Sequence, residues 1–445
     1  MNSVEIERKV DKKNVNYQWI FLCLFFSISF FHPITLLIFL FYLIFLVYKE
    51  KEIGGIKALN LLTLREVINP GLAISYGVLQ SIKWLLIFLI SFYLICSVVK
   101  LHERDLNKLK KYFIFFIIYI IYSILSSFIF SNLPIVAIFK IISYAIPFIG
   151  LLIGVVYTRN KISWITWLKW LFSIIVIVSF PLIFLPLGYL RNSISFQGIL
   201  NHPNLFGVFL VLFITLYLVS IQQRIKLRKN NVWNYLLVIL GIIMILLTNS
   251  RTSLGSTLCI LLIFILFCEY KLIKKVLFFS ISSIIMAIMI PNFDILYQFL
   301  QDFFLKGGTN ILDSRTDQLG SLMKAYISNP LFGRGFAVPY ISKRTYTFSF
   351  NYVVEPGNLI MAVLAYGGIF GLILFLFFII KTILFNIKSF TTYIILPLSA
   401  ILVCMGEMVF FSTNNIGIFI YMFLIIYVSE GVNIKSDVGH RIGKE

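Results

Sequence analysis

Long apolar blocks, separated by short polar connections, make up most of this chain. The blocks run for roughly 17–25 residues, the length at which an α-helix crosses a hydrocarbon core about 30 Å thick. Backbone N–H and C=O groups inside lipid must be bonded within their own segment, so each block is predicted to be helical. The pattern predicts an all-α polytopic membrane protein of about 12 transmembrane helices, at residues 17–48, 76–99, 112–132, 135–157, 164–190, 204–221, 232–248, 252–268, 275–291, 357–380, 392–411 and 414–430.

The beginning of the chain allows two interpretations. Residues 17–48 are too long for one straight crossing and barely long enough for two, and His32-Pro33 interrupts them. One kinked or partly re-entrant element is the preferred prediction and gives about 12 crossings in all. A hairpin followed by a short extra crossing near residues 56–75 is the alternative and gives about 14 crossings.

The charges lie mainly in the short connections. The formal net charge is +20, but this placement is typical of a membrane protein and argues against a nucleic-acid partner. Basic connections are expected on the cytoplasmic side. They are residues 100–111, 158–163, 222–231 and 269–275, so that both termini are cytoplasmic, while residues 131–134, 191–203, 249–251, 292–356 and 412–413 face outward.

We divide the chain into N-terminal helices, central helices, one large extracytoplasmic loop and C-terminal helices with a tail, at residues 1–190, 191–291, 292–356 and 357–445. Within the loop, apolar side chains recur at helical spacing and predict an amphipathic helix on the membrane surface or over a cavity. Ser314 and Asp317 form its capping-box start, and Asn329-Pro330 form its stop. The apolar positions are Leu319, Leu322, Met323 and Tyr326.

Polar groups at the outward ends of the predicted crossings are the candidates for chemistry. They are Arg191 followed by Gly198, His202 and Asn204; the pair Ser250-Arg251; Arg315 followed by Arg334; and Glu355 followed by Asn358. Arginine suits a diphosphate, because its guanidinium is planar, permanently charged and bidentate toward phosphate oxygens. Arg191, Arg251 and Arg315 would bind a lipid-linked diphosphate and stabilise its charge as it leaves. The alternative for each arginine is a contact with anionic lipid headgroups.

Glu355 stands before a Pro-Gly turn at a helix entrance, where its carboxylate would take a proton from a sugar hydroxyl. The alternative is a surface acid favoured by the helix dipole. His202 is either a local capping residue or a catalytic one. Neither the cysteines nor the acidic residues show metal-ligand spacing, and no ATP-binding or zinc-hydrolase motif occurs, so no metal or cofactor is predicted.

These residues resemble the O-antigen polymerase and O-antigen ligase family, which includes polymerases of capsular and teichuronic polysaccharides. In that family an Arg, a Gly and a Pro-Asn pair lead into a mid-chain crossing, and a Ser-Arg pair opens the core region. The matching residues here are Arg191, Gly198, Pro203-Asn204 and Ser250-Arg251.

The family's external loop carries an Arg, an amphipathic helix and a Pro-Leu-x-Gly-x-Gly stretch, which Arg315, the predicted helix and residues 330–335 resemble. A His-Asn pair then precedes the next crossing in the family. Here Asn358 matches, but Gly357 replaces the histidine, and this departure moves the predicted base to Glu355.

The resemblance implies a metal-independent glycosyltransferase, similar in architecture to the lipid-dependent membrane enzymes. The leading hypothesis is a polymerase that transfers a glycan from a polyprenyl-diphosphate carrier to another lipid-linked repeat unit, on the outer face of a bacterial cell membrane. Membrane lipids, a flippase and a chain-length regulator are the further partners that it implies.

Two other functions remain open: a ligase with a different acceptor, and a flippase or transporter of the lipid-linked unit. A flippase is expected to carry charged residues in mid-crossing. The predicted crossings are nearly free of charge at their centres, with Lys140, Lys169 and Glu407 as exceptions.

Overall fold

The computed structural model describes residues 12–268, 316–339, 344–346, 357–386, 390–413 and 415–441. These residues form α-helices with a few 3₁₀ turns, and their one isolated β-bridge joins Ile68 and Leu200. The predicted crossing at residues 275–291 lies outside the described residues. The helices are α2 (Lys12–Ile28), α3 (Pro33–Glu50), α4 (Glu52–Glu66), α5 (Gln80–Cys96), α6 (Glu103–Phe130), α7 (Pro134–Thr158), α8 (Trp164–Ser179), α9 (Pro203–Lys226), α10 (Val232–Leu247), α11 (Arg251–Phe267), α14 (Thr316–Ser328), α15 (Leu359–Phe385), α16 (Phe390–Tyr393), α17 (Ile395–Cys404) and α18 (Gly417–Arg441).

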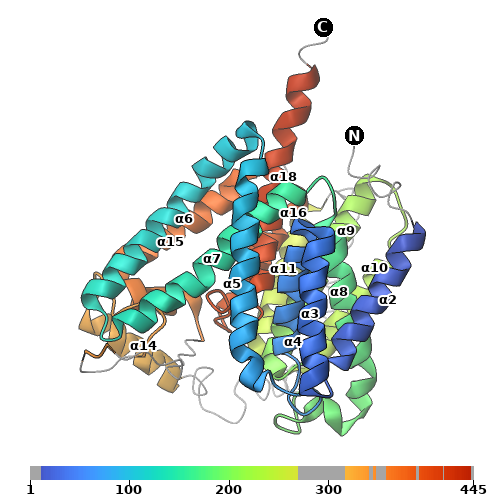
Figure 1. Cartoon of the computed structure of the whole chain (residues 1–445), viewed down its shortest axis with the longest axis horizontal. Helices are drawn as coiled ribbons and strands as arrows, with labels where there is room; N and C mark the ends of the chain where they lie inside the picture. The colour runs from blue at the N-terminus through green and yellow to red at the C-terminus, as the bar shows by residue number, and fades with distance from the viewer. Residues whose placement is uncertain are drawn as a thin grey trace, which may run out of the picture.

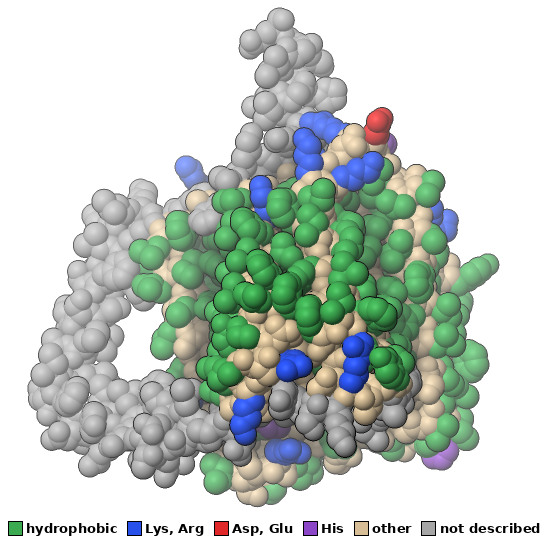
Figure 2. Space-filling view, turned by 90° about the vertical axis from the view of Figure 1, so that its left-hand side faces the viewer, with side chains coloured by type: hydrophobic (Ala, Val, Ile, Leu, Met, Phe, Trp, Pro, Cys, Tyr) green, Lys and Arg blue, Asp and Glu red, His purple; other side chains and the backbone are tan. Residues whose placement is uncertain are grey.

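Seven helical stretches of the described chain are long and apolar enough to cross a membrane, and several shorter apolar helices accompany them. The protein is therefore a polytopic, all-α membrane protein, as predicted. On the face shown in Figure 2, hydrophobic side chains form a broad band, and lysine and arginine side chains gather mainly above and below it.

The start of α2 and the end of α18 lie at one end of the bundle, which we call the termini end, and α14 lies at the opposite end, which we call the α14 end (Figure 1). Helix α9 runs between the two ends in the interior, and nearly all of its side chains are buried. Residues 417–428 of α18 are buried as completely. Close packing around these two buried helices fixes the positions of the residues at their ends.

Residues 12–66 contain three helices, so the preferred prediction of one kinked element over residues 17–48 is wrong. His32 is the last residue of the connection between α2 and α3, and it caps α3. Its Nδ1 accepts a hydrogen bond of 3.2 Å from the backbone N of Ile34. Pro33 occupies the first position of α3, where a missing N–H costs nothing. The hairpin alternative is confirmed, but the extra helix is α4 (Glu52–Glu66) rather than a crossing near residues 56–75.

Two further predicted crossings differ from the structure. The predicted crossing at 164–190 is helical only to Ser179, after which 3₁₀ turns continue to Tyr189. The predicted crossing at 392–411 contains α17, which is only 10 residues long and ends at Cys404. The backbone from residue 405 to 413 is not helical. Because α17 ends early, residues 405–413 form a non-helical segment that contains Glu407, within a block that the sequence pattern predicted to be one crossing.

The amphipathic helix predicted in the long loop is confirmed as α14. Leu322 is buried and Leu319 and Tyr326 are partly buried, while Met323 of the predicted apolar face is exposed. The guanidinium of Arg334 bonds the C-terminal end of this helix, with Nε 2.8 Å from Ser328 Oγ. Asn329-Pro330 follows the last helical residue, as predicted.

Helix α15 is broken at Gly368, and the segment after α14 fills the break. Gly368 has φ +65° and ψ −163°, a region that only glycine occupies comfortably. The backbone N of Arg334 donates to Ala365 O at 3.0 Å, and the backbone N of Ile369 donates to Pro330 O at 2.9 Å. These bonds satisfy backbone groups that the break would otherwise leave without partners. Gly367 and Gly371 of α15 lie against the Tyr122 ring.

Replacing Gly368 with alanine is expected to destabilise the protein by at least about 1–3 kcal/mol, from backbone strain alone. A Cβ there would also lie 2.3 Å from the backbone of Leu331. The midpoint of thermal unfolding in detergent measures the effect. Gly255→Ala is the matched control, because a Cβ on this α11 residue meets nothing within 4 Å. An equal midpoint for both variants would contradict the described break.

Candidate functional site

Three helix N-termini meet on three consecutive residues, Met405, Gly406 and Glu407, in the turn that follows α17. The helices are α9, α11 and α15, which are far apart in the sequence and all begin at the same end of the bundle. One contact from each helix reaches one residue of the turn. We call Asn204, Arg251, Asn358 and Glu407 the Glu407 cluster; all four side chains are partly exposed.

The N-terminus of α9 is joined to Glu407. His202 is the N-cap of α9, and its Nδ1 accepts a hydrogen bond of 3.1 Å from the backbone N of Asn204. Pro203 sets the first helical position. The Asn204 side chain then donates from Nδ2 to Glu407 Oε1 at 2.7 Å. A short bond to a carboxylate is a strong one, and it orients the Glu407 side chain.

The N-terminus of α11 packs on Gly406. Asn249 has φ +52°, which turns the chain sharply between α10 and α11, and Arg251 is the first residue of α11. Thr252 lies so close to Gly406 that a Cβ on that glycine would stand 2.1 Å from Thr252 Cγ2. Glycine at 406 therefore allows the start of α11, with Arg251, to approach the turn that carries Glu407.

The N-terminus of α15 is joined to Met405. Asn358 is the N-cap of α15, and its Oδ1 accepts a hydrogen bond of 3.1 Å from the backbone N of Met361. The same amide donates from Nδ2 to Met405 O at 3.0 Å. One side chain thus caps a helix and fixes the position of the turn.

The cluster combines positive and negative elements at close quarters. A helix N-terminus presents backbone N–H groups and a partial positive charge. Three of them converge here, and the helix α11 among them begins with Arg251. Such an arrangement favours a phosphate group. The carboxylate of Glu407 is the one acidic side chain among the contacts described, and it can accept a proton.

Residues 236–376 match the family model described as O-antigen ligase. The chain carries an O-antigen ligase domain. The resemblance seen in the sequence is therefore confirmed over this region. A comparison with curated proteins finds no match to the chain.

The O-antigen ligase domain contains two members of the Glu407 cluster, Arg251 and Asn358, while Asn204 and Glu407 lie outside it. Helices α10 and α11, helix α14 and most of α15 belong to the matched region. The segments before and after the domain therefore complete the cluster, with Asn204 and Glu407 respectively.

Other residues singled out in the sequence are placed apart from the cluster or are not placed. Arg191 is exposed in the connection before α9, where its backbone N donates to Gln197 Oε1 at 2.9 Å. Gly198, in the same connection, has φ +56°. Arg334 is bonded to the end of α14. Arg315 and Glu355 lie outside the described residues. No group of three or more metal-ligating side chains occurs in the described part of the chain.

Glu407 is the residue that sequence reasoning missed as a site candidate. It stands in an apolar block, where it was noted only as a charge within a crossing. An ionisable residue in such a block is by default a functional candidate, and this signal could have identified it.

Proposed function

We propose that this protein is a polysaccharide polymerase, which transfers a glycan from a polyprenyl-diphosphate carrier to a sugar hydroxyl of another lipid-linked repeat unit. The O-antigen ligase domain supports the substrate class. The convergence of three helix N-termini on the turn that carries Glu407, one of them beginning with Arg251, is the observation that supports the position of the reaction.

In the proposed step, the acceptor hydroxyl oxygen attacks the anomeric carbon of the donor sugar. The bond from that carbon to the diphosphate oxygen breaks, and its electron pair leaves with the diphosphate. Arg251 and the helix N-termini stabilise the negative charge that develops on the leaving group. The hydroxyl proton passes to a carboxylate.

Two carboxylates are candidates for this base. Glu407 is held by Asn204 at the helix N-termini. Glu355 lies outside the described residues, but it precedes by only three positions Asn358, which bonds Met405. Arg191 and Arg315 remain proposed diphosphate ligands, and His202, Arg334 and Asn358 remain proposed substrate-binding residues.

The α14 end is proposed to face outward. Consecutive helices alternate in direction, which brings the basic connections around Lys100, Arg159 and Arg224 to the termini end. Positively charged connections favour the cytoplasm. The ion pairs between Arg159 and Asp105 at 2.9 Å and between Lys100 and Glu52 at 2.6 Å tie helices together at this end.

A flippase is the less supported function. One of the charges that left it open, Lys140 of α7, donates from Nζ to Ala337 O at 2.6 Å and so holds the segment after α14. Another, Lys169, lies over the ring of Tyr217, with Nζ 4.8 Å from the ring centroid. Glu407 belongs to the cluster at the helix N-termini.

Reconstitution in liposomes with the polyprenyl-diphosphate-linked repeat unit tests the proposal. A polymerase is expected to produce a ladder of products that differ by one repeat unit, without any other acceptor. A requirement for a second acceptor would indicate a ligase. Movement of the unit across the bilayer without a new glycosidic bond would contradict the enzymatic proposal.

A further inference from the structure

A polar pocket, separate from the Glu407 cluster, lies at the end of α4, in the connection between α4 and α5 and outside the O-antigen ligase domain. Its volume is about 390 Å³, and its lining includes Arg65, Glu66, Ile74, Tyr76, Gln80 and Asn201. The connection is pinned to the chain before α9, because the backbone N of Asn69 donates to Ile199 O and that of Asn201 donates to Val67 O, each at 2.9 Å. The pocket is therefore a built feature of the bundle.

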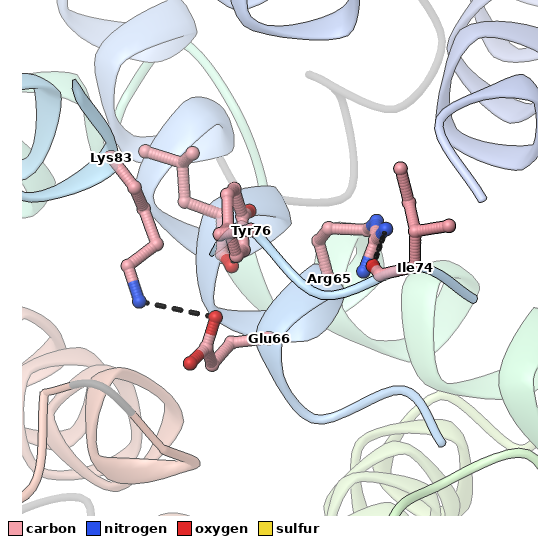
Figure 3. Close-up of polar contacts among 6 residues, drawn as sticks. Arg65, Glu66, Ile74, Tyr76 and Lys83 are labelled. Atoms are coloured by element: carbon pink, nitrogen blue, oxygen red, sulfur yellow. Dashed lines mark hydrogen bonds and ion pairs between the residues drawn. The ribbon is translucent and has the colours of Figure 1, made fainter. Parts of the chain in front are cut away.

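The two cations at this pocket are engaged inside the protein. Arg65 is 2% exposed and donates to the backbone oxygens of Ser29 and Ile74, so it joins two connections at the α14 end (Figure 3). The side chain of Lys83 is 1% exposed, and its Nζ lies 3.1 Å from Glu66 Oε2 (Figure 3). The ring of Tyr76 lies under this ammonium group at 5.0 Å. Burial raises the pKa of Tyr76, so its hydroxyl remains neutral.

Negative charge and amide groups face the pocket instead. The side chain of Glu66 is 24% exposed, which makes its carboxylate the most accessible charge of the three. Asn201 and Gln80 add amides that both donate and accept. Hydroxyl groups match such a lining, because a hydroxyl can donate to the carboxylate and can both donate to and accept from the amides.

The side chain of Asn201 gives a second, independent indication that the pocket binds a ligand. Its Oδ1 is buried and has no hydrogen-bond partner among the described residues. A buried polar atom without a hydrogen-bond partner destabilises the folded protein, so a ligand that supplies the partner is favoured. Because Asn201 lines the pocket, a hydroxyl bound there is a candidate partner for its amide. Ile68, Ala73 and Ile74 supply apolar walls for the C–H faces of a sugar ring.

We propose that this pocket binds a neutral, hydroxyl-rich sugar residue of the acceptor glycan. The proposal rests on the proposed function. The pocket and the Glu407 cluster lie close together along the chain, because Asn201 lines the pocket and Asn204, three residues later, bonds Glu407. Three residues span at most about 11 Å. A short oligosaccharide in the pocket can therefore place its end at the Glu407 cluster, and the pocket selects which glycan is extended.

Isothermal titration of the purified protein in lipid nanodiscs tests the pocket. The probe is the repeat-unit oligosaccharide itself, released from its carrier by mild acid. Ser75→Trp, at the exposed rim, is expected to weaken binding by about tenfold or more, because the indole fills the pocket. Asn201→Leu is expected to weaken it about 3–10-fold, the effect of one lost hydrogen bond.

Val78→Trp is the matched control, since Val78 is 94% exposed in the same connection and does not line the pocket. It is expected to bind as the unsubstituted protein does. Equal affinity in all variants, or no binding by the unsubstituted protein, would overturn the proposal. Loss of inorganic pyrophosphate binding in Ser75→Trp would overturn the ligand class.

The glycan-transfer assay separates this proposal from the proposed function. If Ser75→Trp keeps its affinity while Arg251→Lys loses transfer, the pocket proposal fails and the proposed function stands. If Ser75→Trp loses affinity while Arg251→Lys and Glu407→Gln keep full transfer, the pocket stands and the proposed chemistry fails.

Discussion

Glu407→Gln is expected to reduce glycan transfer by about 10²–10⁴-fold, the usual contribution of a general base. Glutamine has nearly the same shape, and its Oε1 can still accept the hydrogen bond from Asn204 Nδ2 that the carboxylate accepts now. The substitution therefore removes the proton acceptor and leaves the contacts of the turn in place. Initial rates of repeat-unit coupling in liposomes measure the effect, with the amount of protein in the membrane as normalisation.

Glu103→Gln is the control for this variant. Glu103 is an exposed acid in the first turn of α6, at the termini end, and its replacement is expected to leave the rate unchanged. Glu355→Gln, measured in parallel, decides between the two carboxylates. A full loss in Glu355→Gln with a normal rate in Glu407→Gln would assign the base to Glu355 and leave Glu407 as a residue that orders the turn.

Arg251→Lys is expected to lower the rate of transfer by about 10²–10³-fold, as is typical when one group that stabilises developing charge is lost. Lysine keeps the positive charge but loses the planar, bidentate guanidinium that matches a diphosphate. The loss is expected mainly in kcat rather than in KM, because the charge on the leaving group grows in the transition state. Rates at saturating and limiting lipid-linked donor separate the two quantities.

Arg224→Lys is the matched control. Arg224 lies in the last turn of α9, at the opposite end of the same helix that carries Asn204, and it donates to Asn230 O at 3.0 Å. Normal transfer by Arg224→Lys and a large loss in Arg251→Lys are expected. A normal kcat in Arg251→Lys would mean that Arg251 contacts lipid headgroups rather than the leaving group.

The helices of the central bundle follow closely from the pattern of apolar residues. The predicted crossings at 204–221, 232–248 and 252–268 correspond to α9, α10 and α11, whose ends coincide with polar motifs. Helix α4 was harder to recognise, because it is enclosed by protein rather than by lipid. Asn60 is 0% exposed in the middle of α4. A helix shielded in this way can carry polar residues that hydropathy does not associate with a membrane segment.

The candidate site was only partly visible in the sequence. Arg251, Asn204 and Asn358 each begin a predicted crossing and were expected on one face of the membrane, because alternating helices return to the same side. Residues 392–411 have the apolar composition of a crossing, and nothing local in them states that the helix ends at Cys404. Packing decides this end, since Thr252 occupies the space beside Gly406.

The order and length of apolar blocks were enough to establish the all-α membrane fold and the amphipathic helix, because both depend on local composition and spacing. The resemblance to a family came instead from short polar motifs, and the match over residues 236–376 confirms it for that region. The meeting of three helix N-termini on Met405–Glu407, and the pocket between α4 and the chain before α9, depend on contacts between residues distant in sequence. Such contacts are set by the close packing of the bundle. Only the tertiary structure could show which polar residues become neighbours.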